Sequence, residues 1–208
     1  WRAAAPINGR QFACVGPMKR WTPVATAAAL LAGCSTSSPP PRVAEAPPPP
    51  KPASMAPYLW TLGNAPQAHK DFVATFGRTG LKPGQYLWTD SIPTDGQTRV
   101  VIDRLTQMAY VYRADKLVGA TTVSTARQGY ITPLGEWKVL EKRPFYRSKK
   151  YDNAPMPWMQ RIDQYGIALH GGGTPGHPES HGCIHLPNKF AEKLYGLTKV
   201  GSEVIIEG

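Results

Sequence analysis

The chain has 208 residues, of which 41% are hydrophobic and 18% are charged. This composition can build a folded core and excludes a wholly disordered chain. The net charge of +10 leaves nucleic acid, an anionic lipid surface and an acidic polymer as possible partners. A polytopic membrane protein is excluded because no run of about 20 apolar residues occurs, and three cysteines are too few for a disulfide-rich scaffold.

The residues after the first methionine, Met18, are typical of an export signal. A basic start is followed by an Ala-rich apolar stretch, residues 21–31, that is too short to span a bilayer stably. The stretch ends in Leu31-Ala32-Gly33-Cys34, which is similar to the lipobox of bacterial lipoproteins. We therefore expect residues 1–17 to be upstream sequence, residues 18–33 to be a lipoprotein signal peptide, and Cys34 to be lipidated. A plain cleaved signal peptide, in which Cys34 has no role, is the alternative.

Residues 34–57 form a Pro-rich linker without apolar periodicity, which favours an extended polyproline conformation. The linker is either a spacer that lifts a domain away from a membrane or a segment with no distance role. Without residues 1–33 the chain would carry 20 basic and 14 acidic residues, a net charge of +6. Since no motif that reads DNA or RNA is present either, we expect no nucleic-acid partner.

Residues 58–98 are expected to form a small N-terminal subregion packed on the main domain. Within it, residues 68–76 predict a short helix with Phe72, Val73 and Phe76 on one face. Glycines at positions 77, 80 and 84 would end this helix.

From residue 85 onward, short β-rich runs predict a mainly β domain. Residues 99–103 and 108–112 are separated by a short turn and predict a hairpin. Further strands are expected at residues 116–124, 136–141, 166–170 and 203–207. Residues 188–197 predict a late helix, because Phe190, Leu194 and Leu197 recur at the spacing of one buried helix face.

The stretch from residue 167 to residue 188 holds four of the five histidines and Cys183. If Cys34 is acylated and residues 1–17 are not translated, Cys183 has no disulfide partner. An unpaired thiol is a liability in an oxidising compartment, so its presence indicates a use. A catalytic thiol needs a base and donors for an oxyanion. His170 follows an apolar strand and suits the base, and we expect it to lower the pKa of the thiol below the free value of about 8.5.

Ser180-His181-Gly182-Cys183, preceded by a strand that ends in His170-Gly171, resembles the signature of the L,D-transpeptidase catalytic domain. The turn at residues 132–137 and the stretch at residues 156–159 are also similar to that family. The resemblance covers about residues 99–207. It implies a mainly β, sandwich-like fold with one late helix and a capping lid at residues 144–160, where Phe145, Tyr146, Tyr151 and Trp158 would close a groove over a peptide stem.

The resemblance also implies the role of each site residue. Cys183 would be the nucleophile, His170 the proton acceptor and donor, and the Gly171 carbonyl the group that orients the His170 ring. His181 would hold the substrate or the oxyanion. The expected substrate-binding residues are Ser180, Gly182, His185, Tyr151, Met156 and Trp158. No metal or organic cofactor is expected.

Two features depart from the family pattern. His185 stands where many relatives have Arg, and it cannot give a permanent charge or a bidentate grip on a carboxylate. The spacing from His170 to Cys183 is also shorter than in many members, and resembles a subgroup with a compact loop. Both departures put the preference for donor or acceptor in doubt.

The export signal, Cys34 and the Ser35 that follows it would make the chain a periplasmic protein, lipid-anchored to the outer membrane. By the family resemblance it would be an enzyme. It would form a thioester with a peptidoglycan tetrapeptide stem, release D-Ala, and transfer the stem to an amine of a neighbouring stem or of a wall-anchored lipoprotein. A hydrolase that resolves the thioester with water and an inactive wall-binding module are the alternatives. A zinc site formed by His177, His181, Cys183 and His185 is disfavoured, because these residues lack the paired-Cys or HExxH arrangement.

Overall fold

The computed structural model describes residues 60–208, which belong to one compact unit. The predictions for the signal peptide, Cys34 and most of the linker lie outside the described residues. The part of the chain that is described contains no helix long and apolar enough to cross a membrane.

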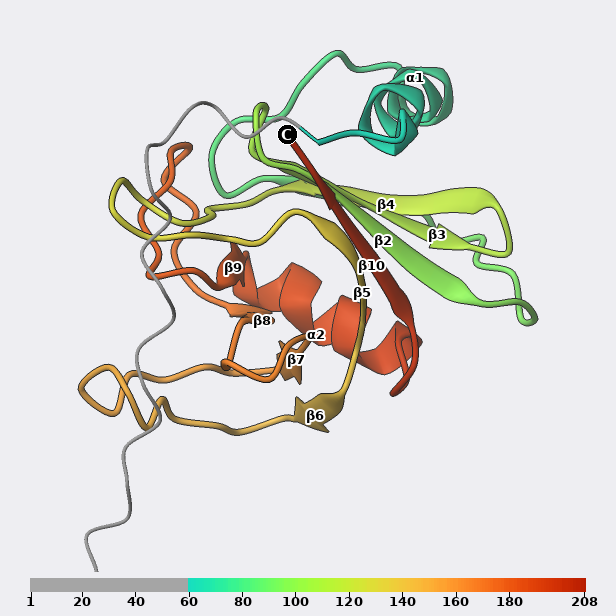
Figure 1. The fold of residues 1–208 in the computed structure, drawn as a ribbon. Coiled ribbons are helices and arrows are strands. Elements are labelled where there is room, and N and C mark those ends of the chain that lie inside the picture. The colour runs from blue at the N-terminus through green and yellow to red at the C-terminus, as the bar shows by residue number, and fades with distance from the viewer. Residues whose placement is uncertain (1–59) are drawn as a thin grey trace, which may run out of the picture. The chain divides into compact units, whose positions relative to one another are not determined.

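Ten strands and two helices make up residues 60–208, which confirms the mainly β prediction (Figure 1). The strands of the larger sheet follow the order β1-β4-β3-β2-β10-β5. They are β1 (Tyr86–Trp88), β2 (Thr98–Asp103), β3 (Met108–Arg113), β4 (Lys116–Thr122), β5 (Gly135–Lys138) and β10 (Glu203–Glu207). The smaller sheet follows the order β6-β7-β8-β9, with β6 (Glu141–Arg143), β7 (Met159–Arg161), β8 (Ala168–Gly171) and β9 (Ile184–Leu186).

Both faces of the larger sheet are covered, which explains why its strands read as nearly continuous apolar runs. Val100 and Ile102 of β2 point to a core shared with α2 (Asn188–Leu197) and the smaller sheet, whereas Val101 points to a second core under α1 (Asn64–Phe76). Figure 1 shows the two helices on opposite faces of this sheet. Helix α2 thus packs the smaller sheet against the larger one. The face of the smaller sheet that points away from this core is left free to form a functional site.

The structure confirms the predicted bounds of α2 and of β10. Phe190 and Leu194 of α2 are fully buried, and Leu197 packs at the edge of the core. The prediction of one strand at residues 136–141 is wrong. The Val139 N–H donates to the carbonyl of Ser202, the residue before β10 of the larger sheet. The Leu140 N–H donates to the Arg161 carbonyl of β7 in the smaller sheet. The chain therefore passes from one sheet to the other at this point, and the run is divided into β5 and β6.

The first helix begins at Asn64, four residues before the predicted start, because a distant carboxylate caps it. Glu207 of β10 is almost fully buried and accepts hydrogen bonds from the backbone N–H groups of Leu62, Asn64 and Ala65 at 2.8–3.1 Å. These N–H groups have no partner within the helix. The buried face consists of Ala65, Ala68 and Phe72, and Val73 is exposed, contrary to the prediction.

The cap makes the Glu207 carboxylate a determinant of stability. Burial alone would raise the pKa of Glu207, but its hydrogen bonds from Ala65, Leu62, Asn64 and Thr61 outweigh burial and hold the pKa below its usual value. We expect Glu207→Gln to lower the free energy of unfolding by about 2 kcal/mol, since several charge-assisted bonds are lost. Amide exchange should accelerate in α1.

Glu203→Gln, on the same strand, is the matched control and should leave exchange in α1 unchanged. Because the pKa is lowered in the fold, the contribution of Glu207 is present above about pH 4.3, the unfolded value, and is lost as the pH falls through the folded value. Equal stability of Glu207→Gln and the unchanged protein in thermal unfolding at pH 7 would contradict the role of this cap.

Candidate active site

The candidate site lies where the two parallel strands of the smaller sheet run side by side. Backbone pairing sets Leu169 beside Ile184, and His170 beside His185. Side chains alternate between the faces of a strand, so the buried Leu169 and Ile184 point to the core and the two histidines point to the opposite face. Cys183 lies two residues before His185 and comes to the same face.

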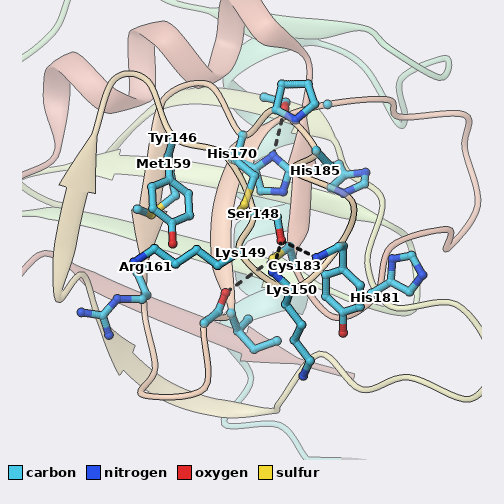
Figure 2. Close-up of a pocket in the computed structure, with 18 of the residues that line it drawn as sticks. Tyr146, Ser148, Lys149, Lys150, Met159, Arg161, His170, His181, Cys183 and His185 are labelled. Carbon is cyan, nitrogen blue, oxygen red and sulfur yellow. Dashed lines mark hydrogen bonds between the residues drawn. The ribbon is translucent and has the colours of Figure 1, made fainter. Parts of the chain in front are cut away.

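This face forms the floor of a cavity of about 570 Å³ (Figure 2). His170, Cys183 and His185 all line it, and the rings of the two histidines lie 4.8 Å apart. Segment 146–156 forms the opposite wall. The residues that line the cavity are Glu141, Tyr146, Ser148, Lys149, Lys150, Tyr151, Asp152, Ala154, Pro155, Met156, Met159, Arg161, Tyr165, Gly166, Ile167, His170, Gly171, Gly172, Gly173, His181, Cys183 and His185.

His170 is held in an orientation that suits a base. Its Nδ1 lies 2.9 Å from the Gly171 carbonyl oxygen, so the contact expected from the family resemblance is present. A carbonyl only accepts, so Nδ1 carries the proton and Nε2 is left as an acceptor. Burial, followed by the neighbouring His185, lowers the pKa of His170 to about 4, although the bond to Gly171 opposes the shift. The imidazole is therefore neutral at pH 7 and able to take a proton.

The turn before Cys183 is fixed by bonds from its own residues. Ser180 Oγ donates to the Cys183 carbonyl at 2.6 Å and accepts from the Gly182 N–H at 3.0 Å. Gly182 has a φ of 131°, and a Cβ there would lie 2.6 Å from Ile167 Cδ1 and 3.0 Å from the Ile131 carbonyl oxygen, so no larger residue fits. Ser180 and Gly182 do not line the cavity. Their prediction as substrate-binding residues stays a prediction, and in this structure they shape the turn that presents the thiol.

The Cys183 thiol differs from the sequence-based expectation of a lowered pKa. Burial raises the pKa of the thiol to about 11, and Asp163 adds to the shift, while a backbone hydrogen bond at Ala168 opposes it. The thiol itself faces the Gly166 carbonyl at 3.7 Å. The resting pair is thus a neutral thiol and a neutral imidazole, because burial disfavours either charge.

His185 stands at the position where many relatives have an arginine, but it does not carry the positive charge of an arginine. Its Nδ1 lies 3.6 Å from Glu179 Oε1 and has no hydrogen-bond partner among the described residues. Burial lowers the pKa of His185 and outweighs the opposite effect of Glu179. The ring is therefore largely uncharged at neutral pH, and the cationic grip of an arginine is missing here.

The predicted lid is only partly the wall of the cavity. Tyr146, Tyr151 and Met156 line it, as the sequence predicted. Trp158 does not; it packs on Tyr195 of α2, with ring centroids 5.5 Å apart, and against Phe145. Its assignment to substrate binding stays a prediction. Phe145 is 84% exposed and likewise does not line the cavity.

His181 lies apart from the other two histidines in Figure 2. Its ring is stacked on Tyr151 with centroids 4.4 Å apart, and its Nε2 lies 2.8 Å from Arg127 Nη2. Burial and then the Arg127 charge lower the pKa of His181, against the effect of Asp152. Residues 60–208 hold no group of three or more histidine, cysteine or acidic side chains arranged to bind a metal.

Several cavity residues were not predicted. Lys149 and Lys150 on the lid and Arg161 of β7 line it. Asp163, which was not predicted either, lies behind the cavity wall: it accepts from the N–H groups of Tyr165 and Ile167 at 2.9 and 2.8 Å and so forms the turn that carries Gly166 to the thiol. An Asp followed by Gly three residues later is a turn signal that could have identified this segment.

Comparison with known proteins agrees with this geometry. The sequence model of the YkuD family, described as the L,D-transpeptidase catalytic domain, matches residues 97–206. The chain belongs to this family. YqjB of Bacillus subtilis (strain 168), which is assigned to the L,D-transpeptidases by its name, is 27% identical over 129 residues, 55% of this chain and 73% of its own.

Solved structures of L,D-transpeptidases have the same fold. The structure from Stackebrandtia nassauensis is 31% identical, with a TM-score of 0.50 over 57% of this chain and 58% of its own. Structures from Mycobacterium smegmatis and Mycobacterium tuberculosis H37Rv both have a TM-score of 0.51 over 54% of this chain, at 19% and 22% identity, and 59% and 58% of their own lengths are covered. The chain thus spans under two thirds of these solved structures. Family and fold together support a transpeptidase function.

The neutral resting pair predicts an unusual pH dependence for Cys183. Alkylation by iodoacetamide follows the thiolate fraction, so its rate should still rise between pH 9 and pH 10, since the thiol pKa is about 11. His170→Ala should leave this profile unchanged, because burial and not His170 sets the thiol pKa. His177→Ala, an exposed histidine of the same loop, is the control. A half-maximal rate at or below about pH 8.5 would show a resting ion pair instead.

Proposed function

We propose that this chain is a peptidoglycan L,D-transpeptidase that uses Cys183 as the nucleophile and His170 as the proton carrier. The observation that supports this most is the register of β8 and β9, which brings the two side chains to one face in one cavity. The Gly171 carbonyl fixes the proton on Nδ1 of His170, so that Nε2 remains to accept the thiol proton.

The donor would be a tetrapeptide stem whose last residue is D-Ala. As the Cys183 Sγ attacks the carbonyl carbon before D-Ala, the thiol proton passes to His170 Nε2. The C–N bond then breaks, His170 returns the proton to the leaving amine of D-Ala, and a thioester remains on Cys183. An acceptor amine next attacks the thioester, its proton passes through His170 to the sulfur, and the free thiol is restored.

The buried pair suits a proton transfer that is coupled to attack. Separate charges are disfavoured on both Cys183 and His170, whereas a thiolate and an imidazolium formed together attract each other strongly in a site of low dielectric. The Gly182 N–H is already bonded to Ser180 Oγ. The Cys183 N–H has no acceptor among residues 60–208 and is the backbone donor that we assign to the oxyanion.

The finer points of this function rest on the family resemblance. The acceptor amine would belong to a second stem, which gives a 3→3 cross-link, or to a lysine of a wall-anchored lipoprotein. We further propose that the mature chain begins at Cys34, carries a lipid there, and lies in the periplasm at the outer membrane. The export signal supports the periplasm, and Ser35, rather than Asp, after Cys34 resembles the outer-membrane sorting choice of a Gram-negative host.

The reaction is tested by incubating the purified protein with disaccharide tetrapeptides and analysing the products by mass spectrometry. We expect cross-linked dimers with loss of D-Ala from the unchanged protein. Cys183→Ala should give none, and His170→Ala should lower the rate by about 10²–10⁴-fold, the range of a general base. His177→Ala should keep the unchanged rate. Tripeptide monomers without dimers would establish a hydrolase, and unaltered substrate would contradict the proposal.

The location is tested by cell fractionation of the unchanged protein and of Cys34→Ala. The unchanged protein should enter the membrane fraction and be released by detergent, and Cys34→Ala should be found in the soluble periplasmic fraction. A wild-type protein that is already soluble in the periplasm would favour the plain cleaved signal peptide.

A further inference from the structure

We propose that Arg127, Tyr130, Tyr151 and His181 form a latch that holds the lid over Cys183, with Tyr151 and Arg127 as positioning residues. His181 is the centre of the latch: it stacks on Tyr151 from the lid and bonds Arg127 from the loop that follows β4. The lid, the nucleophile turn and this loop are thereby joined at one imidazole, two residues before the thiol.

The lid half of the latch is a preformed hairpin. Met156 donates to the Tyr146 carbonyl and Ser148 donates to the Ala154 carbonyl, both at 2.9 Å. Asp152 and Asn153 turn the chain at its tip with φ values of 42° and 52°. Tyr151 therefore projects from a hairpin with its own hydrogen bonds, and the hairpin can move as one piece about its base.

The fixed half of the latch is the loop around Arg127. The Arg127 N–H donates to the Ser180 carbonyl at 3.0 Å, which ties this loop to the nucleophile turn. The Tyr130 ring meets the His181 ring edge-on at 4.6 Å and 87°, and the Arg127 guanidinium lies 5.1 Å from the centre of the Tyr130 ring. His181 is thus held in place from this side whether or not Tyr151 contacts it.

The chemistry of the contacts indicates a closure that is easily released. The Tyr151 and His181 rings are nearly parallel, at 16°, and offer each other flat aromatic faces. An arginine only donates, so Nε2 of His181 is the acceptor and the ring is neutral, which favours stacking over repulsion by Arg127. A single aromatic pair is weak enough for a substrate that enters the cavity to displace it.

This arrangement changes the role expected for His181. Its Nε2 is already occupied by Arg127, and one of its faces by Tyr151. In the closed form the ring thus contacts the lid and the Arg127 loop. Tyr151, predicted to bind substrate, would in this form contact His181, and would reach a substrate only after the latch opens. Once D-Ala has left, renewed closure of the latch would keep water from the thioester until an amine resolves it.

The latch is tested on the full chain through access to Cys183, with iodoacetamide as a small reagent and a maleimide that carries a polymer chain as a bulky one. Tyr151→Ala should raise the rate of the bulky reagent by about two- to tenfold, the factor that corresponds to the loss of one aromatic pair. The rate with iodoacetamide should not change. Tyr151→Phe keeps the ring and should behave as the unchanged protein.

Phe145→Ala is the matched control, since Phe145 is an exposed aromatic residue of the same lid that lies outside the cavity. It should leave both rates unchanged. Equal bulky-reagent rates in Tyr151→Ala and the unchanged protein would overturn the latch, and so would an equal rise for both reagents, which would show general loosening.

A second readout rests on the proposed function. In turnover of the tetrapeptide, Tyr151→Ala should increase release of tripeptide at the expense of dimer, while Tyr151→Phe should not. The proposed function and the latch can be refuted independently of each other. Turnover by Cys183→Ala would refute the proposed function and leave the access measurement intact, whereas an unchanged access ratio in an enzyme that needs Cys183 would refute the latch alone.

Discussion

The parallel pairing of β8 with β9 is the constraint on which the site depends. Parallel strands need a crossover connection of about a dozen residues or more, and the connection here consists of the twelve residues between Gly171 and Ile184. It contains no helix. The chain must therefore turn tightly, and Gly176 and Gly182, with φ values of 94° and 131°, allow this. The spacing from His170 to Cys183 is short because the connection between the two parallel strands is close to the shortest that such a crossover allows.

Burial of that pair decides its chemistry. The same low-dielectric surroundings raise the pKa of Cys183 and lower the pKa of His170, so neither group carries charge before substrate arrives. A neutral thiol reacts slowly with oxidants and with stray electrophiles. A protein with an unpaired cysteine benefits from this protection, and reactivity appears when a substrate carbonyl is in place to receive the sulfur.

The sequence predicted those parts of the fold that local pattern determines. Helix α2 has a complete apolar face and strand β10 is a continuous β-branched run, and both were found with their bounds. The start of α1 could not be found, because its cap, Glu207, lies more than 140 residues away. The break between β5 and β6 depends on partners at Ser202 and Arg161 in different sheets. Strands β7 and β9 have three residues each, too few for a periodic pattern.

The same distinction applies to the site. Cys183, His170 and Gly171 belong to two short motifs close together in the sequence, and the structure places Cys183 and His170 in one cavity. Ser180, Gly182 and Trp158 lie in or near recognisable motifs, yet none of them lines the cavity. Arg127 and Tyr130 carry no local signal, because only the pairing of their loop with the nucleophile turn brings them to His181.

The central claim, that Cys183 reacts with the help of His170 in this buried face, is tested most directly by acylation with a carbapenem-type β-lactam followed by intact-protein and peptide mass spectrometry. The account predicts that the unchanged protein gains the mass of one β-lactam on the peptide that contains Cys183. In a folded His170→Ala variant this acylation should be slow or absent. An unchanged mass in the folded wild-type protein, or equal acylation rates in the two proteins, would contradict it.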